Sequence, residues 1–204
     1  MAATIAVVFF APLFRWGLAR PALFWWWMAA SLVVLNGTLW MRQPAIRRLL
    51  LSDCSAGVLK KAAIGLGSAA LLYGIFLAGR WILTGFFPAA EKNVLQVYLL
   101  RPALPAWLIA LLMILIIGPG EEVFWRVFLQ QKMVARFGPA QGCLFAAILY
   151  AGVHAGSGNP VLVLAALTAG LFWGLLYSLT RSPISIIASH VSWDLAVFLV
   201  APFS

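Results

Sequence analysis

Six ionisable side chains in the second half of the sequence lie within apolar text, and their types and spacing could support hydrolysis. A charged group near the centre of a bilayer costs about 2.5–3.5 kcal/mol even on lenient scales, so such groups face a protein interior or a water-filled cavity. There, a carboxylate can act as a general base toward water, and a neutral histidine can share or relay the proton. A second histidine, oriented by an acid, can donate a hydrogen bond to an oxyanion. The candidates for these roles in amide hydrolysis are Glu121, Glu122, Arg126, His154, His190 and Asp194.

The spacing of these residues predicts pairs on helix faces. Glu122 and Arg126 are four residues apart and can form an ion pair on one face, whereas Glu121 points about 100° away from Glu122 and faces a different space. The run Gly118-Pro119-Gly120 just before the pair predicts a break or kink that frees backbone groups near the acids. The same four-residue spacing recurs in two later segments, as Tyr150 with His154 and as His190 with Asp194.

The composition indicates the elements that must position these side chains. Of the 204 residues, 64% are hydrophobic and 9% are charged, and the mean hydropathy is +1.01. Soluble domains contain about 25% charged residues, so an ordinary soluble enzyme, a disordered chain and a disulfide scaffold are excluded. We expect an all-α, polytopic transmembrane helix bundle of six to seven spans, with a catalytic core of four C-terminal helices.

The spans are predicted from uncharged runs, because a membrane helix needs about 20 mostly apolar residues. Residues 137–180 are long enough for two helices, and Ser157–Pro160 is the expected turn between them. The segment Met1–Phe14 is interpreted as a first span or a tilted interfacial helix. The remaining runs are residues 22–41, 62–79 with apolar residues again after Arg80 up to residue 87, 102–120, and 182–204, which contains a single acid, Asp194.

Two parts of the chain are predicted: N-terminal membrane helices over residues 1–101, with a basic cytoplasmic loop at 42–61, and a catalytic membrane core over 102–204.

The net charge of +9 is read as a topology signal, because Lys and Arg collect in cytoplasmic loops. Nucleic-acid binding is not expected, since the basic residues are spread over several loops. This rule also places Lys132, Arg136 and Arg181 in the cytoplasm and residues 88–105, the Ser157–Pro160 turn and the C-terminus outside, while Arg15 and Arg20 contradict it.

Sequence motifs of several other enzyme classes are absent. The sequence contains no His-Glu-x-x-His zinc motif, no Gly-x-Ser-x-Gly elbow and no Gly-Lys-Ser/Thr phosphate loop. Cys54 and Cys143 lie far apart and have no metal-ligand spacing. Gly170 and Gly174 are spaced to allow close helix packing.

Three motifs together resemble the CAAX protease and bacteriocin-processing family, also called the ABI family. Glu121-Glu122-Val-Phe-Trp-Arg126 resembles its Glu-Glu-x-x-x-Arg motif, and Tyr150-x-x-x-His154 resembles its Phe-x-x-x-His motif. The third motif, His-x-x-x-Asn or Asp, is matched by His190-x-x-x-Asp194. The resemblance covers roughly residues 106–203, and the N-terminal half is matched only as generic membrane helices.

The resemblance implies a glutamic-type intramembrane endopeptidase. We expect no metal or other cofactor, because Asp194, one turn from His190, supplies the orienting partner that an oxyanion donor needs. Glu121 would activate the hydrolytic water with His154, and His190 and Asp194 would form the oxyanion side. Glu122 and Arg126, with Tyr150, would play supporting roles. The alternative is a metal-dependent mechanism, because Glu121, His154 and His190 could bind zinc.

Three positions depart from the family pattern without removing a catalytic side chain. Tyr150 stands where phenylalanine is usual, Asp194 where the eukaryotic CaaX enzymes are expected to carry asparagine, and Val127 where many members have glycine. These departures argue against prenylated CaaX peptides as the substrate.

The expected partners are membrane lipid and a membrane-associated peptide or protein substrate cleaved near its end. The expected location is a bacterial inner (plasma) membrane. Two other functions stay open: a proton-coupled transporter or channel that uses the same side chains as a relay, and a non-catalytic membrane scaffold or immunity protein. For Glu122 and Arg126, a purely structural buried ion pair is equally consistent with the sequence.

Overall fold

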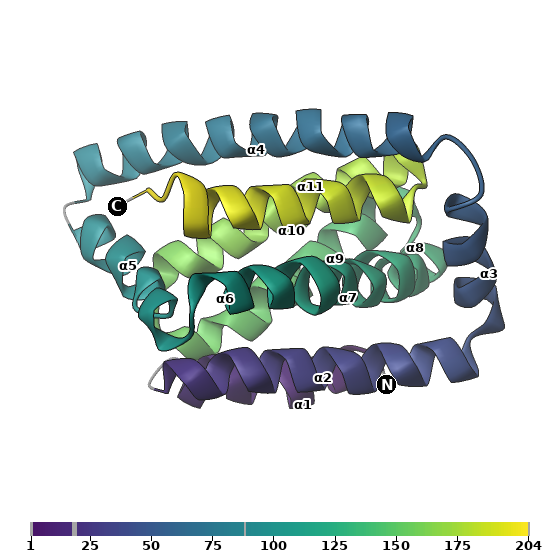
Figure 1. Ribbon diagram of the computed structural model, residues 1–204, viewed down its shortest axis with the longest axis horizontal. Coiled ribbons are helices and arrows are strands. Elements are labelled where there is room, and N and C mark those ends of the chain that lie inside the picture. Colours follow the sequence, from purple (N-terminus) through teal and green to yellow (C-terminus); the bar gives the residue numbers. More distant parts are fainter. Residues whose placement is uncertain (1, 18–19, 88, 204) are drawn as a thin grey trace.

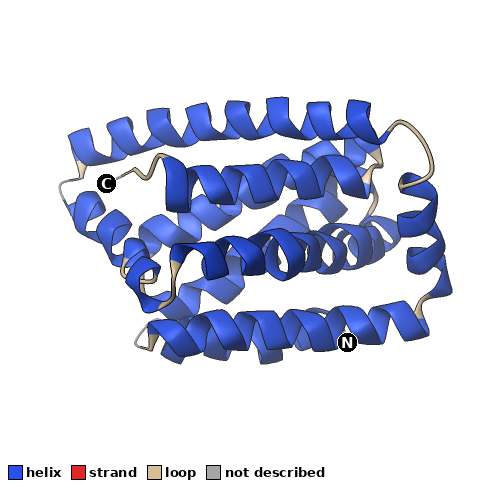
Figure 2. Ribbon diagram, in the orientation of Figure 1, coloured by secondary structure: helices blue, strands red, loops and turns tan. Residues whose placement is uncertain are grey.

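A computed structural model describes residues 2–17, 20–87 and 89–203, so predictions for Met1, Pro88 and Ser204 lie outside the described residues. All regular elements in the described part are helical, as Figure 2 shows, which confirms the all-α fold. The elements are α1 (Ala2–Trp16), α2 (Pro21–Arg42), α3 (Pro44–Asp53), α4 (Val58–Phe86), α5 (Ala89–Tyr98), η2 (Arg101–Ala103), α6 (Ala106–Leu112), η3 (Met113–Ile117), α7 (Gly118–Glu122), η4 (Val123–Gln130), α8 (Gln131–Phe137), α9 (Pro139–His154), η5 (Ala155–Ser157), α10 (Pro160–Thr180), α11 (Pro183–Leu195) and η6 (Ala196–Val200).

Within the described residues, five helical stretches are long and apolar enough to cross a membrane, and the chain is an integral membrane protein. The predicted turn at Ser157–Pro160 is confirmed: Gly158 adopts a left-handed φ of 67°, and α10 begins at Pro160. The helices α9 and α1, with 16 and 15 residues, are shorter than a full span. The five stretches are Pro21–Arg42, Val58–Phe86, Ala106–Phe137, Pro160–Thr180 and Pro183–Val200.

Of the break or kink predicted at Gly118-Pro119-Gly120, the break is wrong, because helix continues from residue 106 to residue 137. Proline has no N–H and would leave a carbonyl without its helical donor. The π-helical segments η3 and η4 on either side absorb this defect, since π turns shift the hydrogen-bond register by one residue. Consistent with that shift, the Gly118 N–H donates to the carbonyl of Met113. The distortion is therefore a change of helical register directly before Glu121.

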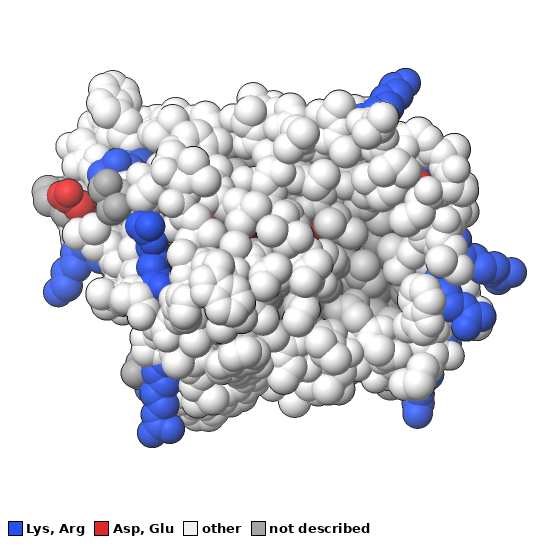
Figure 3. Space-filling view, in the orientation of Figure 1, with Lys and Arg blue, Asp and Glu red and all other residues white. Residues whose placement is uncertain are grey.

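The long helices run side by side along the long axis of the molecule, which gives it two distinct ends (Figure 1). We call one the α3 end; it carries α3 and the α10–α11 connection, whose Ser182 hydroxyl donates to the Asp53 carboxylate over 2.9 Å. The other is the α5 end, where Asn159 Nδ2 donates to the Asn93 carbonyl over 2.7 Å. On the face shown in Figure 3, Lys and Arg lie toward the two ends, and the band between them shows no Lys or Arg and only small traces of Asp or Glu, as expected for a bilayer-spanning bundle.

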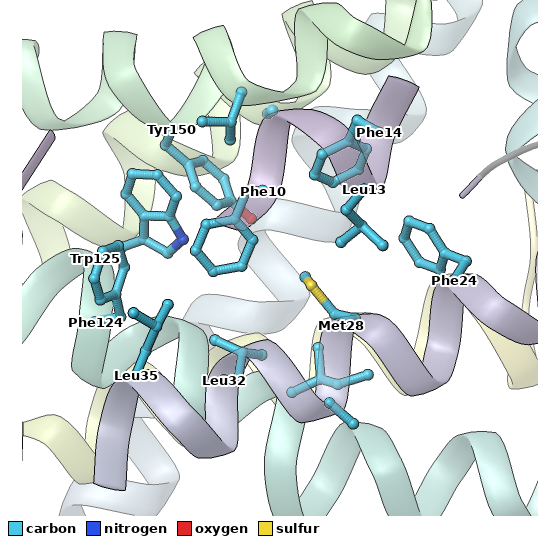
Figure 4. Packing of buried hydrophobic residues seen from close by; sticks show 14 of the residues in the cluster. Phe10, Leu13, Phe14, Phe24, Met28, Leu32, Leu35, Phe124, Trp125 and Tyr150 are labelled. Carbon is cyan, nitrogen blue, oxygen red and sulfur yellow. The ribbon is translucent and has the colours of Figure 1, made fainter. Parts of the chain in front are cut away.

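The N-terminal helix α1 is part of the hydrophobic core. Its side chains Phe10, Leu13 and Phe14 are buried and pack against α2 and against aromatic residues of η4 (Figure 4). The ring centroids of Phe10 and Trp125 are 5.4 Å apart. The division at residue 101 stays a prediction, and this cluster contains residues from both predicted parts.

Small residues let α4 and α10 approach their neighbours closely. A Cβ added at Gly65 in α4 would lie 2.6 Å from the Ala188 Cβ of α11. One added at Gly174 would lie 2.8 Å from the Cys143 sulfur, and one at Gly170 would lie 3.3 Å from the backbone of α9. The close packing expected for the Gly170 and Gly174 pair is confirmed.

Candidate active site

The structure brings the predicted site residues together from three helical segments. They lie on α7 and η4, on α9, and on α11, and all are buried, with 0–8% of their surface exposed. The residues are Glu121, Glu122, Arg126, Tyr150, His154, His190 and Asp194.

One oxygen of the Glu122 carboxylate has two nitrogen partners, from Arg126 and His190. Arg126 Nη1 donates to Glu122 Oε1 over 3.0 Å, which confirms the ion pair expected from the four-residue spacing. His190 Nδ1 lies 2.7 Å from the same oxygen. The Arg126 guanidinium also lies 4.6 Å from the centroid of the Tyr150 ring. The helix formed by α7 and η4, which we call the motif helix, is therefore joined to α11 at a fully buried acid.

Glu121 faces a different space from Glu122, as the helical repeat predicts. Its carboxylate lines a cavity, and its Oε2 accepts a hydrogen bond of 3.1 Å from the Tyr150 hydroxyl. His190 Nε2 lies 3.6 Å from the same oxygen. The Tyr150 hydroxyl, which the usual phenylalanine would lack, is thus a direct partner of the candidate base.

The orientation of His190 differs in one respect from the expectation. Asp194 was expected to orient this ring, but Glu122 holds Nδ1, and Asp194 Oδ2 lies 3.4 Å from Nε2, the nitrogen that also faces Glu121. The physical reason is that Glu122 approaches from the neighbouring helix, a contact that spacing within one helix does not reveal. Trp173 of α10 stacks on the ring, with centroids 3.8 Å apart and planes 17° apart.

His154 lines the same cavity and is fixed from two sides. Its Nδ1 lies 2.7 Å from the Tyr150 carbonyl oxygen. Because a carbonyl only accepts, Nδ1 carries the proton, and in a neutral ring Nε2 is left as an acceptor. Phe14 of α1 packs on the imidazole with ring centroids 4.0 Å apart. Glu121 and His154 share the cavity, and Tyr150 connects them: its hydroxyl bonds to one and its carbonyl to the other.

The cavity beside these groups has a volume of about 310 Å³ and is lined mainly by apolar and aromatic side chains. The carboxyl groups of Glu121 and Asp194 and the imidazole of His190 lie together on one wall of the cavity. Trp193 also lines it, and its buried indole N–H has no hydrogen-bond partner among the described residues. An apolar pocket with a few convergent polar groups is the usual form of a ligand site.

A metal site was the alternative expected from Glu121, His154 and His190. Among the described residues, no group of three or more His, Cys, Asp or Glu side chains is arranged to hold one metal ion. Zinc would need ligand atoms at about 2.0–2.2 Å.

Three further residues support the site and were not identified from the sequence. Trp173 and Phe14 stack on the two imidazoles, and Asn36 of α2 donates from Nδ2 to the Gly120 carbonyl over 3.0 Å. Aromatic residues are so frequent in this chain that neither ring stands out. Asn36 is a polar residue within an uncharged span, and a polar side chain at membrane depth is the signal that could have revealed it.

Comparison with protein families gives a match over the second half of the chain. Residues 103–196 match the model of the Rce1-like family, described as type II CAAX prenyl endopeptidase Rce1-like. This segment contains all the predicted site residues. The comparisons with curated proteins and with solved structures each gave no match.

Proposed function

We propose that this chain, whose residues 103–196 match the Rce1-like family model, is a glutamic-type intramembrane endopeptidase. Its substrate is a membrane-associated peptide or protein, cleaved near one end. The observation that carries the proposal is the position of the Glu121 carboxylate, which faces an apolar cavity and has Tyr150 and His190 beside it. We place the enzyme in a bacterial plasma membrane, surrounded by lipid.

In the proposed reaction, Glu121 and His154 hold a water molecule in the cavity. The Glu121 carboxylate takes one proton from this water, and the oxygen attacks the carbonyl carbon of the scissile amide. His154 Nε2 accepts a hydrogen bond from the water and fixes its direction. When the carbon–nitrogen bond breaks, the proton on Glu121 moves to the leaving nitrogen, so the products are a carboxyl group and an amine.

His190 stabilises the negative charge that develops on the carbonyl oxygen. In its protonated form both ring nitrogens are donors, with Nδ1–H directed to Glu122 and Nε2–H directed toward the reacting carbonyl. Preorganised donors of this kind contribute about 10²–10³-fold to the rate. Asp194, 3.4 Å from Nε2, keeps this donor at the cavity wall before the substrate binds.

The remaining polar residues position these groups. Arg126 balances the charge of Glu122, and that pair keeps the His190 ring in place. Tyr150 orients the Glu121 carboxylate through its hydroxyl and His154 through its carbonyl. In this proposal no cofactor takes part.

The test compares cell membranes that contain the wild-type chain with membranes that contain Glu121→Gln. We expect mass spectrometry to find at least one membrane-associated peptide whose terminus shifts with the wild type and not with the variant. Glu91→Gln, a change at an exposed acid outside the site, is the matched control and is expected to behave as wild type. Identical termini in all three samples would overturn the proposal.

The same samples separate the alternatives. A scaffold or immunity protein would keep its partner phenotype in Glu121→Gln, because that change preserves size. The metal question is tested on the shifted peptide: we expect cleavage to persist after chelation. If chelators abolish cleavage and zinc restores it, the metal-free mechanism is wrong and the peptidase assignment stands.

A further inference from the structure

The cavity extends from the site toward one end of the molecule. Beyond Glu121 and His190, its walls are formed by the last turns of α4, including Thr84, and by Val94 and Tyr98 of α5. Among the described residues, none from α3 or α8 lines it. Two lining residues in the half nearer α5 are exposed at the side of the bundle, Ile75 on α4 (40% exposed) and Leu164 on α10 (46% exposed).

Toward the α3 end, a second cavity of about 230 Å³ is lined by residues of α2, α3, η3 and α7, but by none of the site side chains. Packed side chains fill another part of this end. Val127, Tyr177 and Ile186 form a buried cluster with 4%, 1% and 0% of their surface exposed. Gln130 Nε2 donates to the Gly174 carbonyl over 2.9 Å, which joins the motif helix to α10 on this side. The cavity that Glu121 lines therefore extends only into the α5 half of the bundle.

The basic residues give the two ends different charges. Arg126 is buried in the site. The residues at the α5 end are Arg15, Arg20, Arg80, Lys92 and Arg101, and those at the α3 end are Arg42, Arg47, Arg48, Lys60, Lys61, Lys132, Arg136 and Arg181. Each end also carries one acid, Glu91 or Asp53. Since Lys and Arg near span ends collect on the cytoplasmic side, the larger group places the α3 end in the cytoplasm. Arg15 and Arg20, which contradicted the rule, belong to the smaller group.

From these two observations we infer that the site opens to the non-cytoplasmic side of the membrane. Its substrate is then a polypeptide segment that enters from that side, as part of an exported or membrane-inserted chain. The orientation rests on the cavity and the charges alone, whereas the statement about the substrate rests on the proposed peptidase function.

The orientation is tested by labelling cysteines in intact spheroplasts with a membrane-impermeant maleimide. Cys54 lies exposed between α3 and α4, and we expect it to react only after the membrane is permeabilised. Leu99, 63% exposed just after α5, provides the opposite probe. The variant Leu99→Cys in a Cys54→Ser background is expected to react in intact spheroplasts, and Cys54→Ser alone measures the background from Cys143. Reaction of Cys54 in intact spheroplasts, with Leu99→Cys protected, would overturn the inference.

A second probe tests the cavity itself. Thr84→Cys, in the same Cys54→Ser background, is expected to react in intact spheroplasts, because Thr84 lines the cavity near the α5 end. Reagent bound there is expected to block cleavage of the peptide identified with wild-type membranes, whereas treated Cys54→Ser keeps its activity. Protection of Thr84→Cys in intact spheroplasts would refute the direction of opening.

The labelling pattern does not depend on catalysis, so Glu121→Gln is expected to reproduce it. If the wild type shows the expected labelling but cleaves no peptide, the proposed function is refuted and the orientation stands. Reversed labelling with intact cleavage would do the opposite.

Discussion

The Oε1 atom of Glu122 lies 2.7 Å from His190 Nδ1, and the same oxygen accepts a hydrogen bond of 3.0 Å from Arg126. One buried carboxylate oxygen thus links two residues of the first motif to the imidazole of the third. In the proposed mechanism this link fixes the ring that stabilises the oxyanion.

We therefore predict that Glu122→Ala strongly destabilises the protein. The change leaves Arg126, only 2% exposed, without its counter-ion, and removing one partner of a buried pair costs about 3–5 kcal/mol. Glu122→Gln keeps an acceptor oxygen and should cost less. Thermal unfolding in detergent micelles measures both, with the exposed-site variant Glu91→Ala as control. A loss in Glu122→Ala no larger than in the control would contradict this role.

Asn36 is predicted to act as a positioning residue for Glu121. It holds the Gly120 carbonyl next to the base but does not line the cavity that Glu121 faces. Asn36→Leu should therefore lower kcat several-fold and leave KM nearly unchanged. Thr38→Val, at an exposed position on the same helix, is the control. A rise in KM at constant kcat would show that Asn36 acts on substrate binding instead.

Two glycines on α4 should respond in opposite ways to alanine. At Gly65 the new Cβ would meet Ala188 and the Ser185 carbonyl at 2.6 Å, whereas at Gly67 it would meet nothing within 4 Å. Overpacking costs about 1–3 kcal/mol, and an unhindered change from Gly to Ala stabilises a helix by up to about 1 kcal/mol. We expect Gly65→Ala to melt at a lower temperature than the wild type and Gly67→Ala at the same or a higher one. If Gly65→Ala melted at the same temperature as the wild type, α4 would be free to move away from α11, and the prediction would be wrong.

Asp53 outside the spans gives a pH dependence of stability. Burial alone would raise the pKa of this carboxyl, but hydrogen bonds from the Ile184 N–H, Lys61 and Ser182 outweigh it and hold the pKa below its usual value. A lowered pKa adds stability that is fully present above the unfolded-state pKa of about 3.9 and is lost as pH falls through the folded-state value. Asp53→Asn should thus lose about 1–3 kcal/mol at pH 7, with a smaller difference below pH 4. A difference that stays constant from pH 7 to pH 3 would contradict this.

Much of the site followed from spacing within single helices. The Glu122–Arg126 pair and the separate direction of Glu121 depend only on the helical repeat, and both are confirmed. Contacts between helices could not be predicted in the same way, because they depend on how each helix is rotated. The Glu122–His190 contact and the stack of Trp173 on His190 are of this kind.

In the fold, too, features of single segments were predicted, whereas effects of packing between helices were not. Long uncharged runs gave the spanning helices, since length and hydropathy decide whether a segment crosses a bilayer. The Gly118-Pro119-Gly120 run was expected to break or kink its helix, because proline and glycine disfavour a regular helix. In the protein, packing of α7 against α2 and α11 and the neighbouring π turns preserve the helix, and Asn36 bonds to the Gly120 carbonyl.

The most direct test of the central claim uses the purified chain in proteoliposomes with the peptide identified in membranes. The account predicts cleavage by the wild type and by Glu91→Gln, and a rate reduced at least about 10²-fold in Glu121→Gln, with the melting temperature of Glu121→Gln close to that of the wild type. Cleavage by Glu121→Gln at the wild-type rate would contradict the role of Glu121 as the base that activates water.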